Sequence, residues 1–123
     1  MIKVELFNKF DRDDPLEIVK YVFNSFGNSS DFPEIVDCLL SKEGTSINYE
    51  GCRFPGDLDE GELYNDYNGV PFEGVECWAF DKEITVPENE FFKLLKIACD
   101  RYIELHPDRK DELEKIMSQS TLI

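Results

Sequence analysis

Basic side chains are missing from a long internal segment of this sequence. No Lys, Arg or His occurs between Phe54 and Asp81, although this segment holds eight carboxylates. Over residues 50–90, twelve acidic side chains stand against only Arg53 and Lys82, giving a net charge of −10 out of −14 for the chain. The lack of clustered cations argues against binding to nucleic acid or to an anionic membrane. Concentrated negative charge instead favours a basic protein partner.

Long apolar runs are absent as well. The chain has no stretch of about 18 apolar residues, as a membrane span requires, and residues 1–5 lack the apolar core of a signal peptide. We therefore expect a cytoplasmic protein. No repeat, low-complexity tract or Ser/Gly linker divides the 123 residues, so we expect one domain covering residues 1–123.

The Cys and His residues also lack the spacing of a metal site. The sequence has no Cys-x-x-Cys pair, and its only imidazole is His106, which precedes Pro107 and is expected to cap a helix. The cysteines are therefore expected to be reduced and mostly buried, without disulfides. They are Cys38, Cys52, Cys77 and Cys99.

No catalytic constellation can be assembled from these residue types. Carboxylates are so abundant that some pair would resemble a glycosidase site by chance. Residues 57–62 invite comparison with a calcium loop, but Gly61 comes one position early and Asn68 stands where that loop places Glu. A solvated acidic loop is the favoured interpretation, and we expect neither enzyme activity nor a cofactor or metal.

Helical patterns dominate both ends of the chain. Asp14-Pro15 predicts the start of a helix that ends at Gly27, and a second helix is expected from Ser30 or Asp31 to Gly44. A third begins at Glu88 and stops at His106-Pro107, and a short charged helix follows over residues 108–117. The third carries an apolar stripe of Phe91, Leu94, Leu95, Ala98 and Tyr102.

The middle of the chain is typical of strands and loops. Residues 45–54 predict one strand with a bulge at Gly51, and residues 55–71 have a loop composition. Residues 74–86 predict a hairpin turning at Asp81-Lys82. One of its faces holds Val75, Cys77, Ala79, Ile84 and Val86. The order of elements indicates an α+β fold, a small antiparallel sheet with N-terminal and C-terminal helices packed on it.

Acidic and aromatic side chains of this middle segment are the candidate partner-binding residues. Tyr64 and Tyr67 could be exposed anchors or could pack within the loop, and Trp78 fits a core position beneath the terminal helix somewhat better than an anchor. The candidate set is Asp57, Asp59, Glu60, Glu62, Tyr64, Asp66, Tyr67, Glu73, Glu76 and Trp78.

Several segments within residues 50–117 form a recognisable set: Gly51-Cys52-Arg53-Phe54-Pro55, Asp57-Leu58-Asp59-Glu60, Phe72-Glu73-Gly74-Val75, Glu83-Ile84-Thr85-Val86, residues 90–99, Tyr102 and His106-Pro107. Together they resemble the ribonuclease-toxin immunity proteins of bacterial contact-dependent growth inhibition (CDI) systems. Pro87 departs from the resemblance, because the family tends to place a Ser-type N-cap there.

The resemblance implies a small cytoplasmic protein without catalytic activity. It also implies a partner, a toxic nuclease domain that cleaves tRNA and is carried at the C-terminus of a large secreted protein. The two proteins would form a 1:1 complex. An RNA-cutting domain needs basic residues to hold phosphates, which agrees with the basic protein partner that the charge distribution favours. The alternative function is a charge mimic that antagonises a DNA-binding protein.

Overall fold

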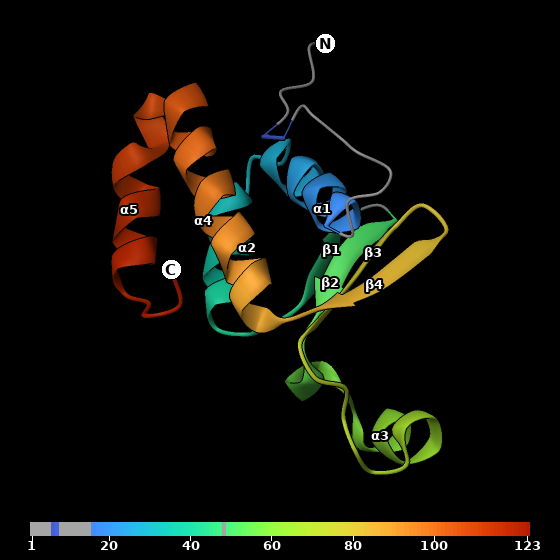
Figure 1. Cartoon of the computed structure of the whole chain (residues 1–123). Coiled ribbons are helices and arrows are strands. Elements are labelled where there is room, and N and C mark those ends of the chain that lie inside the picture. The colour runs from blue at the N-terminus through green and yellow to red at the C-terminus, as the bar shows by residue number, and fades with distance from the viewer. Residues whose placement is uncertain (1–5, 8–15, 48) are drawn as a thin grey trace.

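The fold is α+β, as the sequence predicts. The structure is a computed structural model that describes residues 6–7, 16–47 and 49–123 (Figure 1). The described helices are α1 (Glu17–Gly27), α2 (Phe32–Leu40), α3 (Glu60–Tyr67), α4 (Glu88–Leu105) and α5 (Lys110–Ser118), and the strands are β1 (Thr45–Ile47), β2 (Glu50–Arg53), β3 (Val75–Ala79) and β4 (Lys82–Val86). None of these helices is long and apolar enough to cross a membrane.

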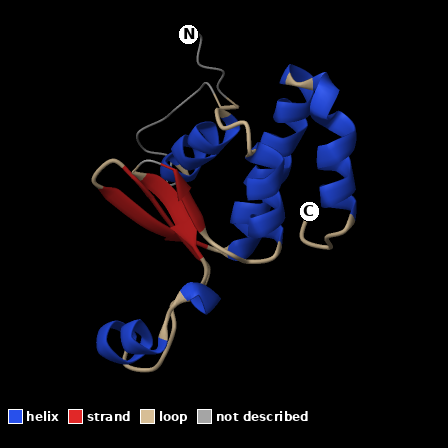
Figure 2. Ribbon diagram, turned by 180° about the vertical axis from the view of Figure 1, so that it is seen from behind, coloured by secondary structure: helices blue, strands red, loops and turns tan. Residues whose placement is uncertain are grey.

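The four strands form one antiparallel sheet in chain order, β1-β2-β3-β4. Its inner face is fully buried at Val75, Cys77 and Ala79, because α1 packs across it. Figure 2 shows the helices α1, α2, α4 and α5 gathered on one side of the molecule, while α3 projects from one end of the sheet. The segment that carries α3 thus projects away from the body formed by the sheet and the other helices.

Helix α4 supplies the largest share of the core. All five residues of its predicted stripe are buried, because apolar side chains at helical spacing fall on one face. Tyr102 stacks on Phe32 of α2 with ring centroids 4.3 Å apart, and Leu113 of α5 is fully buried. The predicted helices at both ends of the chain are therefore confirmed as parts of one core.

The ends of the first two helices differ in part from the prediction. The predicted start at Asp14-Pro15 lies outside the described residues, and α1 ends at Gly27 as expected. Helix α2 stops at Leu40, so the predicted end at Gly44 is wrong. Lys42 adopts the left-handed conformation with φ 57°, and the N–H groups of Lys42 and Glu43 donate to the carbonyls of Leu39 and Cys38. A helix that ends in this Schellman motif usually has Gly at the left-handed position, which Lys42 occupies here. The prediction therefore placed the end of the helix at Gly44.

Residues 45–54 form a hairpin and not the single bulged strand that we predicted. Ser46 pairs with Gly51 across β1 and β2. A Cβ at Gly51 would lie 2.6 Å from the Ser46 Cβ, so only glycine allows the two strands to approach at this point.

The hairpin of β3 and β4 turns one residue earlier than predicted. Ala79 pairs with Lys82, so the turn residues are Phe80 and Asp81, and Phe80 has φ 60°. The predicted turn at Asp81-Lys82 is therefore wrong, and the pairing differs by two residues. A slip of two preserves the side-chain alternation, so the predicted inner face is confirmed.

Candidate functional site

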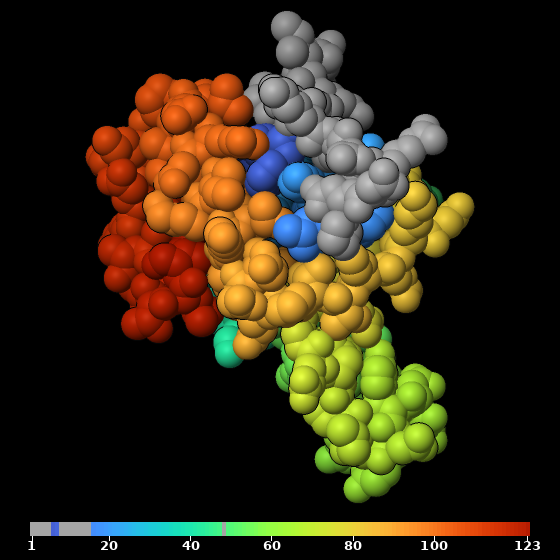
Figure 3. All heavy atoms as spheres, viewed as in Figure 1, coloured from blue at the N-terminus to red at the C-terminus, as the bar shows by residue number. Residues whose placement is uncertain are grey.

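Residues 55–73 form a projecting acidic arm between β2 and β3. The arm holds six carboxylates and no basic side chain. In the space-filling view it stands out from the body as a separate protrusion (Figure 3). We predicted a loop here, but the arm contains a 3-10 turn at Pro55–Asp57 and the helix α3. A helix gives the arm a defined surface that a loop would not.

Helix α3 forms although none of its residues is buried. The Asp59 carboxylate accepts a hydrogen bond from the Glu62 backbone N–H at 2.7 Å, which satisfies a donor that the first turn leaves open. Glu60 and Glu62 add negative charge at the positive end of the helix dipole. Asn68, with φ 53°, ends the helix in the left-handed conformation. Local capping therefore explains a helix that hydrophobic periodicity could not reveal.

Arg53, the last residue of β2, fastens the arm to the sheet. Its guanidinium donates from Nε to the Glu76 carboxylate of β3, from Nη1 to Glu62 of α3 and from Nη2 to the Tyr67 hydroxyl, each at 2.9 Å. The Tyr67 hydroxyl in turn donates to Glu76 at 3.1 Å. The guanidinium also lies 5.8 Å from the centre of the Phe72 ring. One cation therefore joins both ends of α3 to two strands.

This network keeps Arg53 charged. Partial burial lowers its pKa, but the hydrogen bonds that Arg53 donates to Glu62 and Glu76 raise the pKa by more, so the net shift is upward. The pKa of Tyr67 is also raised, first by desolvation and then by its bond to the Glu76 carboxylate. Both groups carry their protons at neutral pH with ordinary pKa values, and the upward shifts extend this state to higher pH.

Three residues fix the base of the arm, namely Asp57, Phe54 and Gly74. Oδ2 of Asp57 accepts from the backbone N–H of Phe54 at 2.7 Å and of Gly44 at 2.9 Å. Phe54 itself is buried and meets Phe91 of α4 edge to face, with centroids 5.7 Å apart. At the other end Gly74 has φ 91°, and a Cβ there would lie 2.3 Å from the Val86 carbonyl oxygen. The arm thus leaves and rejoins the body at fixed points.

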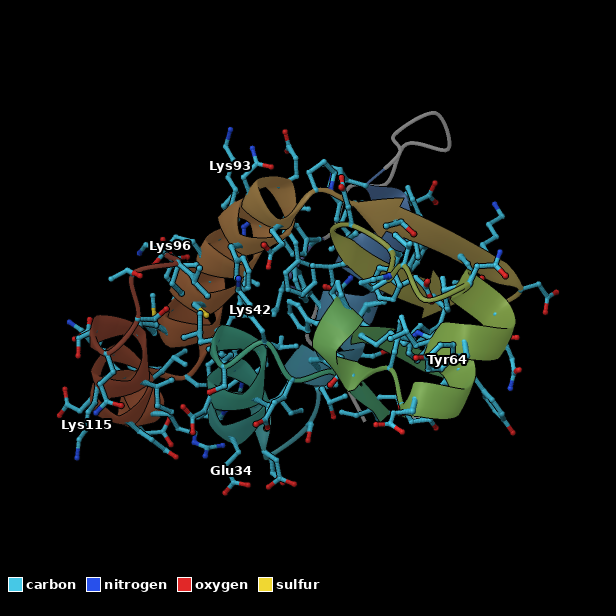
Figure 4. All side chains as sticks on the ribbon, turned by 90° about the horizontal axis from the view of Figure 1, so that it is seen from below. Glu34, Lys42, Tyr64, Lys93, Lys96 and Lys115 are labelled. Carbon is cyan, nitrogen blue, oxygen red and sulfur yellow. The ribbon has the colours of Figure 1, made fainter. Side chains whose placement is uncertain are left out.

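The candidate residues divide into two groups by their contacts. Those with intramolecular partners are Asp57, Asp59, Glu62, Tyr67 and Glu76. Within the described part of the chain, the exposed side chains without such a partner are Glu60, Tyr64, Asp66 and Glu73, and Tyr64 is 72% exposed. Figure 4 shows Tyr64 on α3, viewed from the side of the arm. The second group is free to meet a partner.

Trp78 lies outside the core. Its neighbours in β3, Cys77 and Ala79, are fully buried on the inner face, so Trp78 points to the opposite face, where it is half-buried. Gly51 and Glu83 are its cross-strand partners. The prediction of a core position beneath the terminal helix is wrong for this reason. Glu76 shares this outer face, so the sheet continues the acidic surface of the arm.

Sequence reasoning counted Arg53 only as one of two cations and missed its role. A single arginine among twelve acids, at a predicted strand end, is the signal that could have identified it. The spacing Asp59-x-x-Glu62 likewise resembles a capping box and could have revealed α3.

The calcium comparison and the catalytic alternatives gain no support from this geometry. Asp57 and Asp59 accept hydrogen bonds from backbone groups of different segments. Among the described residues, no three His, Cys, Asp or Glu side chains are grouped as a metal site would require. The His106 ring lies against Tyr102, with centroids 4.4 Å apart, at the C-terminal end of α4.

Comparison with known proteins gives one finding. A family described as CDI immunity protein matches residues 15–117, from α1 to α5 and including the whole arm. No match was found among curated proteins.

Proposed function

Because the chain belongs to the family of CDI immunity proteins, we propose that it binds a basic ribonuclease domain of its cognate toxin and blocks RNA from reaching it. Immunity against a CDI toxin follows from the family itself. In this proposal the toxin is a nuclease that acts on RNA, with tRNA as the leading substrate. The toxin domain and the immunity protein form a 1:1 complex in the cytoplasm.

The observation that carries the proposal is the set of free groups on the acidic arm. Glu60, Asp66 and Glu73 are exposed carboxylates without partners in the described structure, and Tyr64 offers an exposed aromatic ring on the same arm. A ribonuclease holds its substrate with cations that contact phosphates. Carboxylates on a projecting helix can occupy the same cations, while an aromatic ring supplies apolar contact.

Preorganisation by Arg53 adds to the expected affinity. A flexible acidic loop would lose conformational entropy on binding, which lowers affinity. Here α3 is already held to β2 and β3 by the hydrogen bonds of Arg53. Inhibition then requires only that the arm cover or flank the RNA-binding cleft, so the immunity protein performs no reaction itself.

An antagonist of a DNA-binding protein would carry a similar acidic surface, but family membership favours the toxin. The deciding experiment mixes the purified chain with the toxin domain encoded beside its gene. We expect a 1:1 complex by light scattering and loss of RNA cleavage at equimolar ratio. A toxin domain that does not cleave RNA, or that still cleaves it in the complex, would contradict the ribonuclease proposal.

A further inference from the structure

A groove of about 470 Å³ lies at the base of the acidic arm, where the arm meets the body. Its lining includes Lys42, Pro55, Gly56, Phe72, Glu73 and Glu88. A second hollow shares Glu73, Gly74 and Glu88 and extends the groove to the junction of β4 and α4. The volume lies within the range of about 300–1,000 Å³ that is typical of ligand sites.

The groove combines an apolar floor with a charged rim. Pro55 and Phe72, which are half-buried, provide apolar surface, while Glu73 and Glu88 provide carboxylates. A hollow of similar size, about 430 Å³, lies between α2 and the C-terminal residues, but among the residues that line it Asp37 is the sole carboxylate and no side chain is aromatic. The groove at the arm therefore has the chemistry that suits a side chain with an aliphatic stem and a cationic head.

The rim already holds one such contact within the molecule. Lys42 Nζ lies 3.0 Å from Glu88 Oε1, and both side chains are about half exposed, so this pair is weak and exchangeable. Lys42 is labelled in Figure 4, in the segment that follows α2. Glu73, the other carboxylate, is exposed and has no partner in the described part of the chain. The groove thus offers one occupied and one open carboxylate.

We propose that this groove receives a lysine or arginine side chain of the toxin, with its head on the Glu73 carboxylate and its stem against Pro55 and Phe72. The inference rests on the proposed function and names one place on this chain where a toxin cation is anchored. Phe72 of the groove lies against Tyr67 of α3, with ring centroids 5.8 Å apart, so a toxin that meets the free carboxylates of the arm can reach the groove in the same complex.

Gly56 allows a direct steric test with a matched control. A Cβ added to Gly56 meets no heavy atom within 4 Å, so a side chain there can project without disturbing the fold. Gly56→Trp should fill the groove and weaken binding of the toxin domain by about tenfold or more, with an unchanged melting temperature. Gly56→Ala adds only a methyl group and should bind within about twofold of the unmodified protein.

A double-mutant cycle tests the charge contact independently. Glu73→Gln should weaken binding by about fivefold, and coupling should appear with one toxin Lys or Arg and not with the others. The matched control is Glu60→Gln, in the first turn of α3 and outside the groove lining, which should not couple to that toxin residue. If the unmodified chain does not bind the toxin, both proposals are overturned. If it binds and Gly56→Trp and Glu73→Gln bind equally well, only the groove is overturned.

Discussion

Arg53 and Glu76 face each other across β2 and β3, with Nε and Oε1 2.9 Å apart. The same guanidinium reaches Glu62 of α3. Because this cross-strand pair lies at the end of the sheet from which the arm projects, it sets the orientation of α3 relative to the body. The position of the candidate binding surface therefore depends on a residue that need not touch the partner.

Arg53→Ala should loosen the arm without unfolding the body. Loss of three hydrogen bonds from a half-buried cation is expected to cost on the order of 1–3 kcal/mol locally, reduced by solvent screening. Hydrogen exchange measured by mass spectrometry should accelerate over residues 58–69 and remain slow in α4. Lys82→Ala is the control, because it removes the same charge from the exposed first residue of β4. Equal exchange in the arm of both variants would contradict the role of Arg53.

Leu95→Ala should destabilise the whole domain. Leu95 is fully buried in α4, and removal of its side chain should lower the free energy of unfolding by about 2–5 kcal/mol. Leu105→Ala is the matched control on the same helix, since Leu105 is 48% exposed and should cost less than about 1 kcal/mol. Urea unfolding measures both values, and similar losses would mean that α4 presents another face to the core.

Cys99→Ala should reduce the loss of stability at high pH. Burial, with a smaller contribution from Asp100, raises the pKa of Cys99 to about 12, while a thiol in an unfolded chain ionises near about 8.5. The unfolded state therefore releases this proton first, so the contribution is complete below about pH 8.5 and is lost as pH rises toward 12. Between these pH values the unfolding free energy of the unmodified protein should fall more steeply than that of Cys99→Ala, by up to about 1.4 kcal/mol per pH unit.

Urea unfolding at several pH values tests this difference, and parallel curves for the two proteins would contradict it.

A thiol assay tests the reduced state of the cysteines. Four reactive thiols should be counted in denaturant, because all four cysteines are free in the structure. Without denaturant, half-buried Cys38 should react before the three buried thiols.

Tyr64→Ala should act mainly on dissociation of the toxin complex. Tyr64 is exposed on α3, and loss of an aromatic anchor usually raises the off-rate more than it lowers the on-rate. We expect about a tenfold faster off-rate by surface plasmon resonance, with unchanged stability. Tyr49→Ala is the control, because Tyr49 is also exposed, at 87%, but lies at the turn of β1 and β2, away from the arm. Equal off-rates in both variants would place Tyr64 outside the interface.

The sequence predicts the helical body better than the arm, for a physical reason. The stripe from Phe91 to Tyr102 follows the helical period, and its burial follows from that period alone. The helix α3 carries no apolar stripe and depends on caps at Asp59 and Asn68, so its Gly- and Asn-containing composition suggested a loop. The contacts of Arg53 depend on where two strands and a helix meet, which single-sequence patterns do not encode.

The candidate residues were identified by charge and residue type, and the structure sorts them by contact. A variant that replaces Asp57, Asp59 and Glu62 together would remove hydrogen bonds that shape the arm as well as negative charge. A clean test must therefore use carboxylates that have no structural partner.

The most direct measurement is the association rate of the toxin domain as a function of salt for two charge-matched variants. One carries Glu60→Gln, Asp66→Asn and Glu73→Gln in the arm, and the other carries Glu34→Gln, Asp108→Asn and Glu104→Gln on the helical body, where these side chains are equally exposed. If the arm meets a basic cleft, the arm variant should associate about tenfold more slowly at low salt, with a weaker salt dependence and an unchanged melting temperature. The body variant should stay close to the unmodified protein. Equal rates and equal growth protection for the two variants would contradict the claim that the acidic arm binds the toxin.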